Sequence, residues 1–268
     1  MEPLEIQGVW WLPEHDDHRI AGNLRGRLES GGLRLAYPDP RPVSSFLDTA
    51  SHFQDLLSIA VGKTADFERI VIQHPGLPQL SLASTPMGDL RADVEYHARW
   101  SARSDPCPPV ELHKMYFTLA DLGGIEGVER WLGVAEKYRT ELGRVMATRY
   151  SPAMFLEDRI MNVCAALNSF DRVRGGTGKW FKFVKHIKDC VDLAGQPFRD
   201  LIVNSPDSWA ADVKDTRDDL AHHREPFRRE GSVGDHLLTE QLFWLFAMCT
   251  LRLAQAPQAV FDSIAEHA

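Results

Sequence analysis

The sequence predicts an α+β fold: an N-terminal, mainly antiparallel β-sheet domain with one helix, followed by a C-terminal all-α bundle. Two observations support this division. Short aromatic and β-branched segments separated by turns fill the first 120 or so residues. After about Gly124, apolar residues recur every three or four positions, as in amphipathic helices. We therefore expect a β-rich domain at 1–122, a connecting helix at 123–150 and a helical domain at 151–268.

The N-terminal part contains six segments with the composition of strands. These are residues 6–13, 20–28, 33–37, 67–72, 94–100 and 112–117. One helix is expected from Ser45 to Val61, because Phe46, Ala50 and Phe53 begin a row with helical spacing. Gly62 is a typical residue to end it.

Helices account for the remainder. One long helix is predicted to include Ile125–Leu142, and Ser151-Pro152 and Ser205-Pro206 are typical helix starts. The expected ranges of the others are about 179–193, 198–203 and 233–253, and the helix after Ser205 ends near His222.

Composition favours a cytoplasmic globular protein. The net charge is −8, and 44% of the residues are hydrophobic. No apolar run approaches the roughly 20 residues of a membrane-spanning helix, and the acidic first residues are unlike a signal peptide. Four scattered cysteines (Cys107, Cys164, Cys190, Cys249) form no C-x-x-C pair, which argues against a zinc ribbon or a disulfide scaffold. Three of them lie in predicted helices, where a buried apolar role is expected.

The spacing Arg-x-x-x-x-His occurs twice, and about one match is expected by chance. Arg69 and His74 lie on a predicted strand and would point to opposite faces. Arg217 and His222 lie at the end of a helix, about 140° apart around its axis. They can share a site if the helix ends there, or if two copies of it face each other. Histidine and arginine suit metal-independent RNA cleavage, which needs an acid, a base and a cation.

A structural explanation of this motif stays open: a salt bridge at the helix end, with a C-terminal histidine favoured by the helix dipole. Carboxylates at Asp218 and Asp219, one turn before His222 and His223, could orient an imidazole. Two basic stretches offer RNA contacts through Lys179, Lys182, Arg224 and Arg228, although such stretches are often solvated helix faces. His15 and His18 lie in an acidic turn, and we expect no metal there.

The segment Val213–His223, VKDTRDDLAHH, resembles the signature of HEPN domains. Further segments resemble ApeA-type anti-phage defence proteins. These are GVWWLP at 8–13, GNL at 22–24, FQDLLSIA at 53–60, Trp131-Leu132 and Phe155-Leu156-Glu157. The chain departs from the pattern at Asp218, where asparagine is usual, and in the shortness of its N-terminal part.

The resemblance implies a metal-independent HEPN endoribonuclease that cleaves host RNA, with tRNA as the first expectation, in anti-phage defence by abortive infection. His222 would be the general acid or base, Arg217 would stabilise the phosphorane, Asp218 would orient the histidine or the partner protomer, and His223 would be a secondary candidate. The products would carry 2′,3′-cyclic phosphate. A homodimer through the HEPN domain, a phage-derived trigger at the N-terminal domain and no cofactor are also implied.

Two alternatives remain. The protein could be a non-catalytic HEPN interaction or RNA-binding module, including one component of a toxin–antitoxin pair. It could also be the partner subunit of a nucleotidyltransferase.

Overall fold

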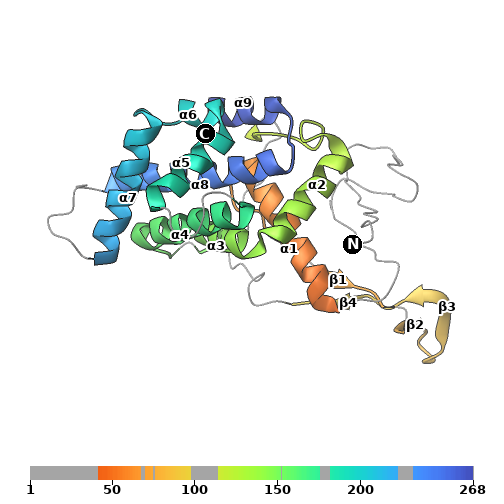
Figure 1. Cartoon of the computed structure of the whole chain (residues 1–268). Coiled ribbons are helices and arrows are strands. Elements are labelled where there is room, and N and C mark those ends of the chain that lie inside the picture. The colour runs from red at the N-terminus through yellow and green to blue at the C-terminus, as the bar shows by residue number, and fades with distance from the viewer. Residues whose placement is uncertain are drawn as a thin grey trace. The chain divides into compact units, whose positions relative to one another are not determined.

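The computed structural model describes residues 42–67, 70–74, 76–97, 114–151, 153–175, 182–222 and 232–267. The predicted strands at 6–13, 20–28 and 33–37 lie outside these residues. Figure 1 follows the elements in chain order: α1 (Val43–Val61), β1 (Val71–Ile72), β2 (Pro78–Leu80), β3 (Pro86–Arg91), β4 (Val94–Glu95), α2 (Gly124–Lys137), α3 (Arg139–Tyr150), α4 (Leu156–Arg174), α5 (Phe183–Ala194), α6 (Gln196–Asp200), α7 (Pro206–His222), α8 (Ser232–Leu253) and α9 (Gln258–His267).

The predicted α+β class is confirmed, because antiparallel strands lie between residues 71 and 95 and the later described segments are mostly helical. The chain divides into two compact units. One comprises residues 1–54 and 65–109, and the other comprises residues 55–64 and 110–268. Helix α1 spans the division between them.

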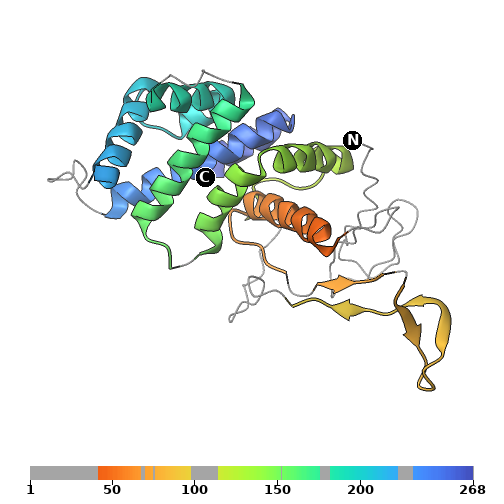
Figure 2. The same cartoon turned by 60° about the horizontal axis from the view of Figure 1, so that its bottom comes forward.

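The strands of the first unit form a narrow antiparallel ribbon. β1 pairs with β4, so that Val71 lies opposite Glu95, and β2 pairs with β3. Backbone hydrogen bonds from Ala92 N to Leu77 O (2.9 Å) and from Tyr96 N to Ile70 O (2.8 Å) extend the pairing between these short strands. Figure 2 shows the resulting ribbon with its hairpin turn. Sequence patterns missed β2 and β3, because both are mostly exposed and β2 has only three residues.

The predicted helix at 45–61 is confirmed as α1, and Gly62 ends it with a φ of 64°. A Cβ built on Gly62 would lie 2.2 Å from the Tyr116 ring, so this close approach requires glycine. Ala60 O also accepts a hydrogen bond from Tyr116 N, at 2.8 Å. The C-terminal end of α1 is therefore fixed to the segment that leads into the helical bundle.

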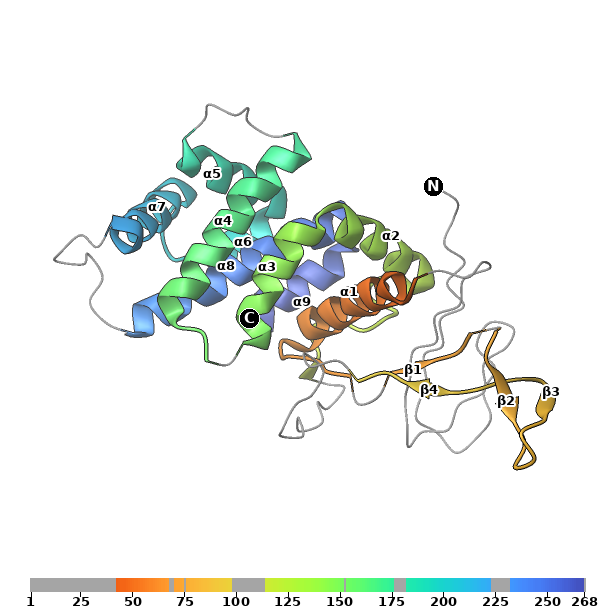
Figure 3. The same cartoon turned by 90° about the horizontal axis from the view of Figure 1, so that it is seen from below.

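Helix α4 lies at the centre of the bundle and packs against α3, α5, α7 and α8 (Figure 3). Its apolar side chains are buried because they recur on the faces that meet these neighbours. The ring of Phe170 lies 4.6 Å from Tyr138 and 5.4 Å from Phe246, measured between centroids. These aromatic contacts join α4 to the α2–α3 junction and to α8.

Three predictions of local structure were wrong. The described part of the expected strand at 112–117, residues 114–117, is not a strand, because Tyr116 and Phe117 pack into the helical unit. The expected long helix is divided at Tyr138, whose backbone leaves helical geometry (φ −110°, ψ 27°). Ser151 follows the end of α3 and does not start a helix, since α4 begins at Leu156 after an extended Phe155.

No helix in the described segments is both long enough and apolar enough to cross a membrane.

Candidate functional site

Helix α7 carries the Arg-x-x-x-x-His motif and is held firmly along its first half. The predicted start is confirmed: Ser205 Oγ accepts a hydrogen bond from Ser208 N at 3.3 Å. Trp209 and Val213 are buried, and the indole Nε1 of Trp209 donates to Gln241 Oε1 on α8 at 2.9 Å. The motif therefore extends from a rigidly packed helix.

Arg217 is half-buried and has contacts on two sides. Its guanidinium carbon lies 4.8 Å from the centroid of the Phe183 ring on α5. Its Nη1 donates to Asp218 Oδ1 at 3.2 Å. Burial raises the pKa of the Cys164 thiol on α4 to about 12. The positive charge of Arg217 opposes this rise. The guanidinium thus lies where α4, α5 and α7 meet.

Asp218 contacts the cations of its own helix. Its Oδ2 pairs with Lys214 Nζ at 2.9 Å, one turn earlier, and its Oδ1 accepts from Arg217. The hydrogen bond and charge of Asp218, followed by those of Asp215, raise the pKa of Lys214. In the described contacts, the Asp218 carboxylate therefore orients the arginine of the motif.

His222 is the last residue of α7 and is exposed to solvent. Among the residues that the structure describes, no hydrogen bond or ion pair joins Arg217 to His222. The helical angle of about 140° between positions five apart explains this separation within one copy. The other candidates His223, Lys179, Arg224 and Arg228 lie outside the described residues.

Asp219, the second of the two carboxylates that precede His222, differs from Asp218 in its burial. It is buried, whereas Thr216 and Leu220 of the same helix are only half-buried. A buried carboxylate requires polar or charged partners, so the burial of Asp219 requires such partners at this end of α7. No spacing rule identifies such a residue, because an aspartate is usually expected on the outer face.

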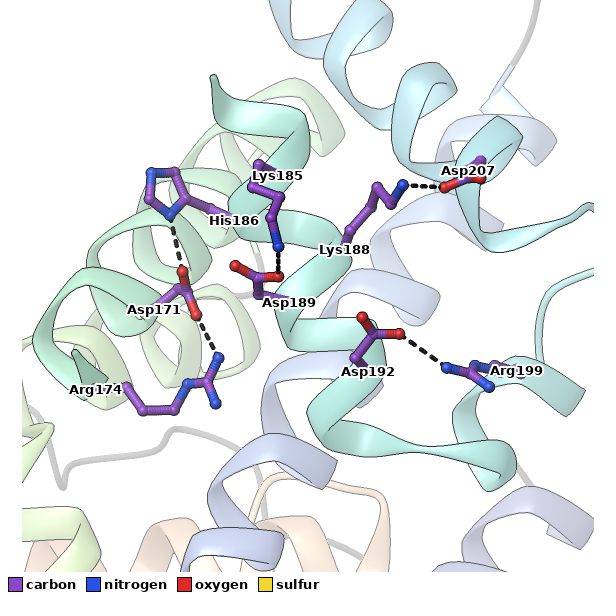
Figure 4. A network of polar contacts seen from close by, with 9 residues as sticks. All are labelled: Asp171, Arg174, Lys185, His186, Lys188, Asp189, Asp192, Arg199 and Asp207. Atoms are coloured by element: carbon purple, nitrogen blue, oxygen red, sulfur yellow. Dashed lines mark hydrogen bonds and ion pairs between the residues drawn. The ribbon is translucent and has the colours of Figure 1, made fainter. Parts of the chain in front are cut away.

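Acidic partners compensate much of the predicted basic stretch on α5. Lys182 is exposed just before the helix. Lys185 forms an ion pair with Asp189, and Lys188 forms one with Asp207 of α7, which raises the pKa of Lys188 (Figure 4). Lys185 and Lys188 therefore have acidic partners, and Lys182 is exposed.

Beneath this surface lies a polar network in which only Arg174, with 27% of its side chain exposed, reaches solvent. Asp171 of α4 receives hydrogen bonds from His186 Nδ1 of α5 at 2.9 Å and from Arg174 Nη2 at 2.6 Å. Figure 4 shows the carboxylate between the imidazole and the guanidinium. Both Asp171 and His186 are completely inaccessible to solvent. This network fixes α5 to α4 one turn after Phe183.

The expected burial of three helical cysteines is confirmed for Cys164, Cys190 and Cys249. The Cys249 Sγ–H donates to the Cys190 carbonyl at 3.2 Å, and hydrogen bonding to Cys249 together with burial raises the pKa of the Cys190 thiol. A thiol held protonated in this way is a poor nucleophile. Within the described segments, no group of three or more His, Cys, Asp or Glu side chains is arranged to hold a metal ion.

Comparison with known families bears on the N-terminal part of the chain. Residues 29–131 match the family model of the ApeA N-terminal domain 1. The match includes α1, with the segment FQDLLSIA, and the whole ribbon, and it ends in α2. It supports the ApeA resemblance and, with it, a role in anti-phage defence. Comparison with curated proteins and with solved structures gave no match.

Proposed function

We propose that this protein is a metal-independent endoribonuclease of the HEPN type that cleaves host RNA, with tRNA as the first candidate, in anti-phage defence. The observation that carries the proposal is the arrangement at the end of α7. There, a half-buried arginine is held by Phe183 and Asp218 while His222 is exposed five residues later. The ApeA match at residues 29–131 supports the defence role.

The chemistry is transfer of a phosphodiester to the neighbouring 2′-hydroxyl. An imidazole of His222 removes the 2′-hydroxyl proton as the 2′-oxygen forms its bond to phosphorus. Arg217 stabilises the extra negative charge of the phosphorane. The bond from phosphorus to the 5′-oxygen then breaks, and a protonated imidazole supplies the proton that the leaving oxygen takes. The products are a 2′,3′-cyclic phosphate and a 5′-hydroxyl.

One copy of α7 offers one such histidine among the described residues, and it does not contact Arg217. A two-fold homodimer would bring a second His222 and a second Arg217 to the scissile phosphate. One His222 would then be the base and the other the acid. Val233 and Leu237, near the start of α8, are exposed apolar residues that a second copy could cover. RNA contacts are assigned to Lys182 and, outside the described residues, to Lys179, Arg224 and Arg228, with His223 as a secondary acid or base.

The experiment is incubation of purified protein with total tRNA in EDTA, followed by mapping of the fragment ends. Wild type is expected to produce discrete fragments ending in 2′,3′-cyclic phosphate. His222→Ala should lower the rate about 10²- to 10⁴-fold, the usual contribution of a general acid or base. His267→Ala is the matched control, because His267 is likewise an exposed histidine at the end of a helix. It should cleave like wild type.

A resting enzyme could require its phage-derived trigger, so the assay is repeated with lysate from phage-infected cells. Absence of wild-type-specific cleavage in both assays would overturn the proposal. Equal cleavage by wild type and His222→Ala would remove His222 from the mechanism.

A second candidate function is a non-catalytic HEPN module. The pairing of Arg217 with Asp218 favours it, because a carboxylate beside the guanidinium weakens its attraction for phosphate. Expression in cells separates the two candidates. Toxicity that His222→Ala abolishes indicates a nuclease, whereas RNA or protein binding that is unchanged in His222→Ala indicates a module.

A further inference from the structure

The position of Arg217 depends on a residue from another helix. A guanidinium group at the end of a long, rotatable side chain loses conformational entropy when it is fixed. A residue that fixes it therefore improves catalysis only if it holds the guanidinium in the orientation that the reaction needs. On its own helix, Arg217 contacts Asp218 at 3.2 Å through Nη1 alone. Among the described residues outside α7, Arg217 contacts the face of Phe183, with its guanidinium carbon 4.8 Å from the ring centroid.

An aromatic ring holds a guanidinium without competing for its hydrogen bonds. The negative face of the ring attracts the cation, while the ring carries no hydrogen-bond acceptor in the plane of the N–H groups. The donors not used by Asp218 thus stay available for the oxygens of a phosphate. A carboxylate in the same place would occupy those donors and cancel the charge. Phe183 therefore suits an arginine that must be both fixed and reactive.

The Phe183 ring belongs to a turn of α5 that is packed firmly against α4. Phe183 is the first residue of α5, and His186 lies three residues later on the same side of the helix. The buried bond from His186 to Asp171 ties this turn to α4, and Arg174 completes the network (Figure 4). Ile187 and Cys190, further along α5, are also completely buried. This packing defines the position of Phe183 relative to the central helix of the bundle.

We propose that Phe183 is a positioning residue of the candidate site, and that its ring holds the Arg217 guanidinium in the orientation in which it stabilises the phosphorane. The proposal rests on the proposed ribonuclease function and adds to it a specific tertiary contact. Phe183 acts through Arg217 and does not itself touch the reacting atoms.

The test combines three variants in the tRNA cleavage assay. Phe183→Leu keeps an apolar side chain and removes the ring face, so kcat should fall about 3- to 30-fold, the range of a cation–π contact, with KM little changed. Phe183→Tyr keeps the ring and should stay within about threefold of wild type. In an Arg217→Ala background, Phe183→Leu should change the residual rate less than about twofold, because the two residues act as one unit.

Two further measurements distinguish loss of the fold from loss of the contact between Arg217 and Phe183. Thermal unfolding identifies a variant that has lost its fold. NMR of the Arg217 side chain, whose resonances are shifted by a ring current, reports the contact in the full-length protein without any RNA. Equal rates for Phe183→Leu and Phe183→Tyr, or an equal loss in the Arg217→Ala background, would overturn the positioning role. A wild type that is inactive both alone and with lysate from phage-infected cells, with the ring-current shift present, would overturn the nuclease proposal while leaving the contact itself in place.

Discussion

The antiparallel ribbon and the helical bundle bury their side chains to very different degrees. In the ribbon, Leu80, Leu82 and Leu90 are each more than half exposed. In the bundle, Phe170 and Leu167 of the central helix are completely inaccessible. The ribbon is thus defined by backbone pairing in short strands, whereas the bundle is defined by packed side chains. Because only the second kind of order fixes side chains closely, the bundle is where the structure can position chemical groups.

This difference predicts that substitutions in the bundle act through packing and buried charge, while those in the ribbon act locally and weakly. Substitutions at selected residues test the contrast by the change they cause in the free energy of unfolding.

The largest effect is expected for Asp171→Ala. This change leaves the imidazole of His186 and the guanidinium of Arg174 without the carboxylate that accepts hydrogen bonds from both inside the bundle. Removing one partner of a buried ion pair costs about 3–5 kcal/mol. Urea unfolding measures the loss. Asp192→Ala is the matched control, because Asp192 pairs with Arg199 at 2.8 Å on the surface and should cost less than about 1 kcal/mol. Similar losses in both variants would contradict the distinction between buried and surface pairs.

A smaller, pH-dependent effect is expected for Asp55→Asn. Asp55 belongs to the helical unit, where Tyr150 Oη donates to its Oδ1 at 2.6 Å, and burial raises its pKa to about 7. The unfolded chain releases this proton near pH 4 and the folded chain near pH 7. The folded state therefore binds more protons between these values, and stability falls as pH rises through this window. The fall is at most about 4 kcal/mol, since each pKa unit corresponds to about 1.4 kcal/mol.

Asparagine cannot ionise and still accepts a hydrogen bond from Tyr150. The difference in stability between Asp55→Asn and wild type should therefore grow in favour of the variant from about pH 4 to about pH 7. It should then stay constant. Urea unfolding at several pH values measures it, and a difference that does not change with pH would show that Asp55 is charged in the folded protein.

The helices could be predicted from sequence because their evidence is local and repeated. Helix α1 and its end at Gly62, and the start of α7 after Ser205, follow from spacing and from end-capping residues. The strand predicted at 112–117 failed for the opposite reason. An apolar run such as Tyr116-Phe117 is compatible with any buried conformation, and contacts with distant residues, such as Trp244 at 4.7 Å, decide which one forms.

The candidate site likewise has one part that could be predicted from the sequence and one part that could not. The sequence identifies Arg217 and His222 as a pair on one helix end, because their spacing lies within a single element. It does not reveal that Phe183 lies against Arg217, since 34 positions separate them and only the packing of α5 on α7 brings them together. The network of Asp171 and His186 is hidden for the same reason. Charged residues are expected at the surface, and no local pattern marks the two that pair inside.

The smallest effect is expected in the ribbon. Leu82 lies in its hairpin turn and is fully exposed, so Leu82→Ala removes side-chain atoms that are already in water and should change the free energy of unfolding by less than about 0.5 kcal/mol. The same substitution at Leu167, which is inaccessible on α4, should cost about 2–5 kcal/mol because it leaves a cavity. Urea unfolding of both variants compares the two regions with identical chemistry. A large loss at Leu82 would mean that its side chain is covered in solution and that the ribbon carries a packed surface of its own.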